Sequence, residues 1–212
     1  ADYFGLRVAA VGNDLVLVSA YTDNAGAAYA GAAYLFNVNG TLLMTLTNPT
    51  PQTTKYFGIS LAAIGSDRML IGANYDNTVA ASAGAAYLYG TNGNLLATIT
   101  DPPARDGDQF GFSLAALDSS HVLICAKGNG ASGYLFVIPE VAPSLSIQLT
   151  STNAVAVVWP SPSVGFVLQQ NTNGIASANW SNVSGNINDN GTNRAVIVSP
   201  PSGNRFYRLF KP

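Results

Sequence analysis

The six residues Ala-Gly-Ala-Ala-Tyr-Leu at 30–35 occur again at 83–88, a spacing of 53 positions. A Phe-Gly pair recurs at the same spacing, as Phe4-Gly5, Phe57-Gly58 and Phe110-Gly111. When residues 4–56 are aligned without gaps on residues 57–109, 25 of the 53 positions are identical. Chance does not produce this level of identity. Self-similarity at a fixed period indicates a repeat architecture, here with a unit of 53 residues.

Each repeat is predicted to contain four short β-strands. In the second copy the apolar runs lie at 58–64, 68–73, 85–89 and 95–100. The last two runs are joined by Asn92-Gly93, and an Asn-Gly pair between apolar runs is a strong hairpin signal. Four antiparallel strands in a repeat of about 50 residues are the plan of a propeller blade. We therefore predict an all-β fold, with three four-stranded propeller-type blades in residues 1–138.

The third copy of the repeat is incomplete. Its tyrosine, Tyr134, comes six residues earlier than the spacing requires, and the Asn-Gly turn is absent. The fourth strand could come from residues 145–150 or from another molecule. Propellers typically close with four to eight blades. Three blades therefore fit a piece of a longer chain, a ring completed by several chains, or an open array that continues from subunit to subunit. We expect completion between molecules.

The repeat resembles the FG-GAP repeat family, which occurs in integrin-type β-propellers and in many bacterial secreted proteins. Besides the Phe-Gly opening, the shared feature is a small-residue strand whose glycines and tyrosines are Gly31, Tyr34, Gly84, Tyr87 and Tyr134. The resemblance covers about residues 2–138. It implies a β-propeller and an extracellular or cell-surface location.

Many members of that family hold calcium in an Asp-x-Asp-x-Asp-Gly loop between the first two strands of the repeat. The corresponding positions here are 11–14, 64–67 and 117–120, and each contains a single aspartate. One carboxylate is far short of the six to eight oxygen ligands that Ca²⁺ takes. We therefore do not carry the family's metal role over to this chain, and we expect no cofactor.

A second module is predicted at residues 145–212, after a linker at 139–144. Its short apolar runs are separated by turn residues at a spacing typical of a small β-sandwich. Trp159, the run at 165–170 and the final segment 202–208 resemble the fibronectin type III-like modules that end many secreted bacterial proteins. Such modules act mostly as spacers or as anchors to a surface or partner.

Composition excludes two classes of partner. Charged residues make up 9% of the chain and the net charge is −2, with no cluster of Lys and Arg to bind nucleic acid. No apolar run approaches the roughly 20 residues of a membrane-spanning helix. The chain begins at Ala1 without a methionine, and we expect either a secreted protein with its signal peptide removed or a trimmed piece. Cys125, the one cysteine, lies in an apolar run and is expected to be buried and inert.

The one local acidic cluster is the stretch at 101–108, which contains Asp101, Asp106 and Asp108. It could bind a cation or act as a glycosidase-like pair of carboxylates. The corresponding stretch of the first repeat, 48–55, has no acidic residue, so the repeat itself does not need this cluster. We therefore expect a solvated loop between blades.

The remaining polar and aromatic candidates have structural interpretations. His121 is the only histidine and has no triad motif around it, so a structural or surface role is expected. The repeated tyrosines are expected to pack in the core rather than to form a sugar-stacking row, and Asp23 and Asp76 to form turns. Trp159 and Trp180 are expected to anchor the core of the second module, although one could be an exposed platform for carbohydrate.

Three classes of function compete. The first is a non-catalytic, secreted structural or adhesive protein that self-assembles through unpaired blade edges into extracellular filaments or rings, as a homo-oligomer or polymer. The second is a lectin-like or protein-binding module at the cell surface. The third, an enzyme, is disfavoured because the sequence shows no combination of nucleophile, base and orienting group.

Overall fold

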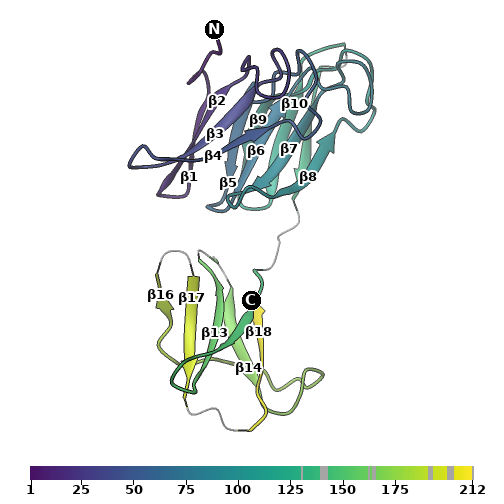
Figure 1. Ribbon diagram of the computed structural model, residues 1–212. Coiled ribbons are helices and arrows are strands. Elements are labelled where there is room, and N and C mark those ends of the chain that lie inside the picture. The colour runs from purple at the N-terminus through teal and green to yellow at the C-terminus, as the bar shows by residue number, and fades with distance from the viewer. Residues whose placement is uncertain are drawn as a thin grey trace. The chain divides into compact units, whose positions relative to one another are not determined.

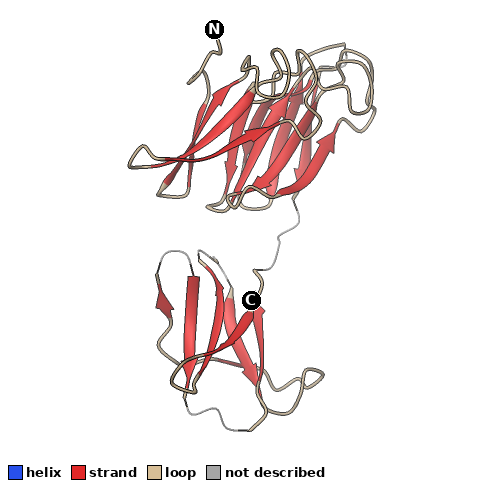
Figure 2. Cartoon of the chain, in the orientation of Figure 1, coloured by secondary structure: helices blue, strands red, loops and turns tan. Residues whose placement is uncertain are grey.

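The computed structural model describes residues 1–129, 131–138, 143–161, 163, 166–190, 193–199 and 203–211. The predicted linker at 139–144, the first residue of the run at 165–170 and the first residue of the segment 202–208 therefore lie wholly or partly outside the described residues. The chain divides into two compact units, Ala1–Glu140 and Val141–Pro212. The described residues contain strands in antiparallel sheets and no helix, which confirms the all-β prediction (Figures 1 and 2). They accordingly include no helix that could span a membrane.

The first unit contains three antiparallel sheets, one for each copy of the repeat. The first sheet contains β1 (Val8–Val11), β2 (Leu15–Ala20), β3 (Ala32–Asn37) and β4 (Leu42–Thr47), paired in chain order. The second contains β5 (Ser60–Ile64), β6 (Arg68–Ala73), β7 (Ala85–Gly90) and β8 (Leu95–Thr100). The third contains β9 (Phe110–Ala116), β10 (His121–Ala126) and β11 (Ser132–Val137). No closed ring of sheets is found among the described residues.

The register of the strands repeats as strictly as the sequence. Val18 pairs with Tyr34 in the first sheet, Ile71 with Tyr87 in the second and Ile124 with Tyr134 in the third. The early position of Tyr134 is therefore absorbed by a shorter loop between β10 and β11, and its place in the sheet is unchanged. A loop tolerates a deletion that a strand does not, because a slip of one residue would turn every side chain to the other face.

Two apolar layers hold the three sheets together. One lies between the first and second sheets and includes Leu17, Leu35 and Phe57. The other lies between the second and third sheets and includes Leu70, Leu88 and Phe110. Every residue of β6 and β7 is buried, because the second sheet is covered on both faces. This explains why, after Arg68 at the start of β6, their sequences are continuously apolar or small instead of alternating.

The small-residue strand is explained by the close approach of successive repeats. Gly31 and Gly84 both have φ +84°, and a Cβ at either position would overlap the carbonyl oxygen of the next repeat's Phe57 or Phe110. The same phenylalanine donates its backbone N–H to the residue before each glycine, Ala30 or Ala83, at 2.9 and 2.8 Å. Glycine is required here both by the backbone conformation and by the space.

The second unit contains two further antiparallel sheets. One has the order β12 (Ser146–Leu149), β13 (Val155–Pro160), β17 (Asn193–Val198) and β16 (Asn188–Asp189). The other has the order β15 (Ser181–Asn182), β14 (Val167–Asn171) and β18 (Phe206–Phe210). β12 pairs with β13 in this sheet, and among the described residues the sheet of the third repeat contains β9, β10 and β11 alone.

Side chains from both of these sheets meet in one core, which includes Val157, Trp159, Leu168 and Val196. Trp159 is buried as expected, and its indole N–H donates to Ser163 Oγ at 3.1 Å. Trp180 lies outside this core and is half-buried, with the guanidinium of Arg208 4.4 Å from its ring centroid. Only one of the two tryptophans therefore anchors the core.

Candidate functional site

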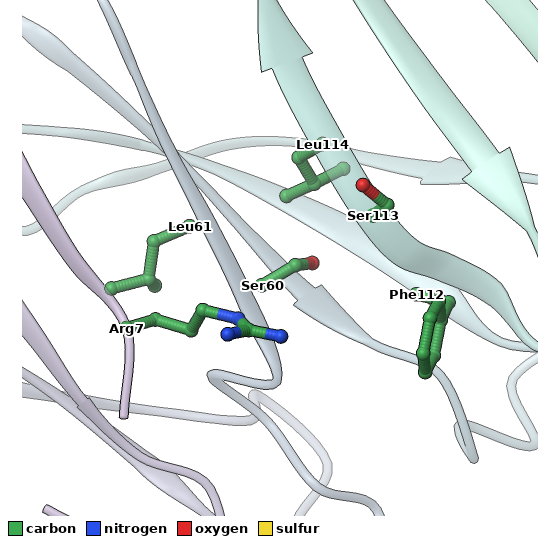
Figure 3. A pocket seen from close by; sticks show the side chains of 6 residues that line it. All are labelled: Arg7, Ser60, Leu61, Phe112, Ser113 and Leu114. Atoms are coloured by element: carbon green, nitrogen blue, oxygen red, sulfur yellow. The ribbon is translucent and has the colours of Figure 1, made fainter. Parts of the chain in front are cut away.

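The first strands of the second and third sheets, β5 and β9, and the residue before β1 line a shallow hollow of about 190 Å³ (Figure 3). Arg7, Ser60 and Ser113 line it and occupy the same position of the repeat. Arg7 Nε donates to the carbonyl of Ile59 at 3.2 Å, and Ser60 Oγ to the carbonyl of Gly111 at 2.5 Å. Both side chains thus tie the start of one repeat to the start of the next, and these contacts give the hollow a structural explanation.

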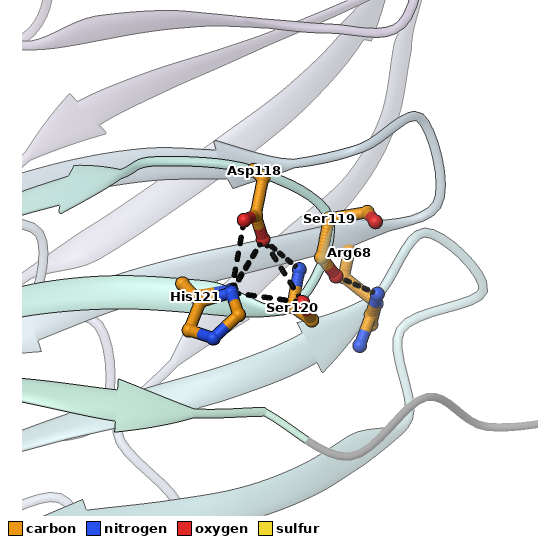
Figure 4. A network of polar contacts seen from close by, with 5 residues as sticks. All are labelled: Arg68, Asp118, Ser119, Ser120 and His121. Atoms are coloured by element: carbon orange, nitrogen blue, oxygen red, sulfur yellow. Dashed lines mark hydrogen bonds and ion pairs between the residues drawn. The ribbon is translucent and has the colours of Figure 1, made fainter.

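His121 lies beside Asp118 and Ser120 at the turn between β9 and β10 (Figure 4), which the sequence did not indicate. In a catalytic triad the serine and the aspartate bond opposite ring nitrogens. Here Asp118 Oδ2 and Ser120 Oγ both contact Nδ1, at 2.8 and 3.0 Å, so the arrangement cannot relay a proton. Hydrogen bonds led by the Ser120 N–H lower the pKa of Asp118, as in a carboxylate that caps a turn.

The most unusual chemistry lies in two buried polar clusters, one at each boundary between sheets. The first junction, between the first and second sheets, comprises Asn48, Lys55, Asp76, Thr78 and Tyr87. The second junction, between the second and third sheets, comprises the buried Asp101 and Asp108 with Tyr134. Nδ2 of the exposed Asn129 donates to the carbonyl of Asp106 at 3.2 Å. The spacing of 53 residues relates Asn48 to Asp101, Lys55 to Asp108 and Asp76 to Asn129.

The first junction is centred on the carboxylate of Asp76, which is buried. Its Oδ2 accepts from Asn48 Nδ2 at 2.7 Å and from the Tyr87 hydroxyl at 2.8 Å. Its Oδ1 accepts from the backbone N–H of Thr78 at 2.7 Å and also from the Thr78 hydroxyl. Burial by itself would raise the pKa of Asp76, but these hydrogen bonds outweigh it and lower the pKa. The expected turn residue is therefore a fully satisfied, ionised centre.

Lys55 supplies the positive charge of the first junction. Its side chain is buried, and among the described residues its ammonium has no hydrogen-bond partner. Burial lowers the pKa of Lys55, and the charge of Asp76 opposes this shift. One buried cation and one buried anion therefore balance each other across the boundary.

The second junction has the opposite composition. Asp101 and Asp108 are 2% and 1% exposed, so the expected solvated loop is wrong for these two carboxylates. Both oxygens of Asp101 and Oδ1 of Asp108 have no hydrogen-bond partner among the described residues. Oδ2 of Asp108 accepts from the N–H of Arg105 at 2.8 Å. Asp106 is exposed as expected, and its Oδ1 accepts from the N–H of Ala81 at 3.1 Å.

Burial raises the pKa of Asp101, and the neighbouring charge of Asp108 raises it further. The hydroxyl of Tyr134 and the charge of Arg105 act in the opposite direction, although the contact with Tyr134 falls short of a hydrogen bond. The buried carboxyl groups at this boundary are thus less well compensated than the single one at the first junction.

The repeat-defining aromatic residues form the same cluster three times. Phe57 packs on Tyr87 and Tyr89 with ring centroids 5.7 and 6.2 Å apart, and equivalent clusters surround Phe4 and Phe110. Phe57 and Phe110 are 0% exposed, but Phe4 is 59% exposed. Tyr34 donates to Asp23 Oδ2 at 2.6 Å, and burial and that partner raise the pKa of Tyr34 to about 12.

Sequence reasoning missed the burial of Lys55 within the electrostatic influence of Asp76, and the burial of Asp101 and Asp108. The spacing of 53 residues contained a signal, because it places Lys55 opposite Asp108 of the next repeat and Asp76 opposite Asn129. When the charges at two repeat positions change together from one copy to the next, the two side chains are expected to share an environment. Only the structure shows that this environment is buried.

The FG-GAP repeat family model matches residues 1–36 and 43–89, which span most of the first two sheets. The match supports the resemblance drawn from the Phe-Gly pairs and the small-residue strand. FG-GAP repeats occur in extracellular or surface proteins and are typically non-catalytic. No curated protein matches the chain.

Proposed function

We propose that this chain is a non-catalytic, secreted structural or adhesive protein in which copies associate end to end through the outer faces of their sheets. In this proposal the three sheets are propeller-type blades of an open array. The second unit, a fibronectin type III-like module, serves as a spacer or anchor. The observation that carries the proposal is that both ends of the stack expose the side chains that the inner boundaries bury.

The first sheet exposes the face that the later sheets bury. Phe4 and Val8 are both more than half exposed. Their repeat equivalents are Phe57 and Leu61, which belong to the apolar layer between the first two sheets or pack against it. The first sheet thus presents the same aromatic surface as its neighbours, with no sheet against it among the described residues.

The third sheet exposes the complementary face. Leu135 is 60% exposed and its cross-strand partner Leu123 is also exposed. Their equivalents in the second sheet, Leu88 and Leu70, are buried in the layer against the third sheet. Cys125 lies on this face and is half-buried, which differs from the expected buried thiol because no further sheet covers it among the described residues.

The two exposed faces fit each other, because each is a repeat of a surface that already packs against the other kind inside the molecule. A second copy of this chain is therefore the occupant that we propose for both. The contact joins two different faces, and such heterologous contacts form rings where the rotation closes and filaments where it does not. The free edge of β11, which pairs only with β10 among the described residues, lies at the same end and offers a further site for strand addition.

Light scattering coupled to size-exclusion chromatography tests the proposal over a range of protein concentrations. We expect oligomers for the natural chain and monomers for Phe4→Asp and for Leu135→Asp. Val79→Asp replaces another exposed apolar side chain, in the loop before β7, and should assemble like the natural chain. Because each aspartate blocks only one end, an equimolar mixture of the two variants should form dimers and nothing larger. A natural chain that stays monomeric up to millimolar concentration would overturn the proposal.

The second candidate function, a glycan-binding or protein-binding module, is favoured by a row of four tyrosines that the sequence did not single out. Neighbouring rings in the series Tyr3, Tyr21, Tyr56 and Tyr75 have centroids 5.3 to 5.5 Å apart. Tyr3 is more than half exposed and the other three are half-buried. A glycan array with the natural chain and with Tyr3→Ala, against Tyr29→Ala as an exposed control, tests this candidate. A binding function requires that the natural chain binds a glycan, that Tyr3→Ala abolishes this binding and that Tyr29→Ala retains it.

A further inference from the structure

The two junctions occupy the same place in the fold but contain different charges. The first contains one carboxylate, Asp76, and one ammonium, Lys55. The second has Asp108 where the first has Lys55, and Asp101 where the first has the neutral Asn48. Asn129 replaces the carboxylate of Asp76. The change from the first junction to the second therefore removes a buried positive charge and leaves two carboxylates.

Two buried carboxylates with a single hydrogen bond between them are costly to form from side chains alone. A charged group that loses its hydration needs an opposite charge or hydrogen bonds in exchange. Three carboxylate oxygens of Asp101 and Asp108 have neither a donor nor a cation in contact among the described residues. The nearby Arg105 is exposed, and its guanidinium therefore remains available to water.

From these observations we infer that the second junction binds a hard metal cation, for which Ca²⁺ is the best match, through the carboxylates of Asp101 and Asp108. The available donors are oxygens, which calcium prefers, and the residues offer no soft ligand that would favour a transition metal. The cation takes the electrostatic role that the Lys55 ammonium has at the first junction. Two side chains do not complete its coordination, so backbone carbonyls and water supply the remaining ligands.

This site is distinct from the loop in which FG-GAP repeats hold calcium. That loop joins the first two strands of a repeat, here β9 and β10 in the third copy. Asp101 and Asp108 lie instead in the segment that joins β8 to β9. The two positions are at opposite ends of β9. The inference also stands apart from end-to-end assembly, since the second junction is complete within one chain.

Terbium luminescence and thermal unfolding of the full chain test the site. Tb³⁺ replaces Ca²⁺ at oxygen sites, and excitation of Tyr134 should sensitise it because this tyrosine belongs to the junction. We expect saturable luminescence that Ca²⁺ displaces. Saturating Ca²⁺ should raise the unfolding temperature of the chelator-treated protein by about 5 °C or more, as binding to the folded state alone requires.

The first junction supplies the decisive variant. The double substitution Asp101→Asn with Asp108→Asn puts the neutral amide that the first junction has at Asn48 in place of both carboxylates, and should abolish both the luminescence and the shift while raising the unfolding temperature in chelator. Asp106→Asn removes an exposed neighbouring carboxylate and should retain both signals. If the double variant does not fold, Asp101→Asn alone should weaken Ca²⁺ binding at least tenfold. Absence of any Ca²⁺ or Tb³⁺ effect on the natural chain, or effects that persist in the variants, would overturn the inference.

Discussion

The first and second junctions share one backbone arrangement and differ in how charge is balanced within it. At both boundaries the backbone of the next repeat's phenylalanine packs against a glycine with a left-handed backbone conformation. A tyrosine of the later repeat, Tyr87 or Tyr134, lies close to a buried carboxylate. At the first boundary the carboxylate has hydrogen bonds and a lysine. At the second, the two carboxylates have one hydrogen bond between them, from the N–H of Arg105 to Asp108, and no lysine among the described residues takes the place of Lys55. The comparison shows that close backbone packing sets where the repeats meet, while the polar side chains are free to change between copies.

The largest expected effect comes from disrupting the contact between glycine and the phenylalanine backbone that both boundaries share. Gly84→Ala should destabilise the first unit by about 4 kcal/mol or more, because the added Cβ would overlap the Phe110 carbonyl oxygen and the backbone would have to move. Gly40→Ala is the matched control: its φ is +82°, but nothing lies within 4 Å of the added atom. It should cost about 1 kcal/mol, the effect of the backbone conformation alone. Chemical denaturation measures both, and equal costs would show that the close approach is unimportant.

The aromatic clusters give the next largest effect. Phe57→Ala should cost about 3–5 kcal/mol, because it opens a cavity in the layer between the first two sheets. Phe4→Ala removes the same side chain of the first repeat, where it is exposed, and should change the free energy of unfolding of the monomer by less than about 1 kcal/mol. Urea unfolding at low protein concentration compares the two. A large cost for Phe4→Ala in the monomer would mean that the first face is already covered.

Acid should weaken the first junction through Asp76. The folded-state pKa of Asp76 lies below the ordinary value of 3.8, so its stabilising contribution is fully present above pH 3.8. That contribution is lost as the pH falls through the lowered pKa. The free energy of unfolding of the natural chain should therefore exceed that of Asp76→Asn by about 2 kcal/mol at pH 6, and the difference should shrink towards pH 2. Urea unfolding at a series of pH values measures it, and a difference independent of pH would contradict the assignment.

The smallest expected effect is the difference in stability loss between phenylalanine substitutions of the equivalent tyrosines Tyr87 and Tyr34. Tyr87→Phe removes a donor from the buried Asp76 and should cost about 1–3 kcal/mol. Tyr34→Phe removes the equivalent bond to the partly exposed Asp23, where water can replace the hydroxyl, and should cost about 0.5–1 kcal/mol. Thermal unfolding of both variants ranks them. The reverse order would show that the first repeat, despite its open face, holds its carboxylate more tightly.

Much of the fold could be predicted from the sequence because the repeat is visible in it. The Asn-Gly hairpins, the continuous apolar strands and the recurring Phe-Gly pairs depend on interactions within one repeat or between neighbours in the chain. The all-β prediction is confirmed for these reasons. The expected solvated loop was wrong, because charge is the usual sign of exposure and Asp101 and Asp108 are exceptions to it.

By itself, the sequence determined the period and the strands, since these follow from local backbone preferences repeated every 53 residues. The tertiary structure alone decided which copy of each residue is buried. Phe4 and Phe57 have the same local sequence, but one lies at an end of the stack and the other inside it. Buried charges show the same dependence on the places where sheets meet. Lys55 is balanced there by Asp76, whereas three oxygens of Asp101 and Asp108 have no partner among the described residues. Burial depends on what the rest of the chain places against a residue, and the residue's own neighbours in sequence do not specify it.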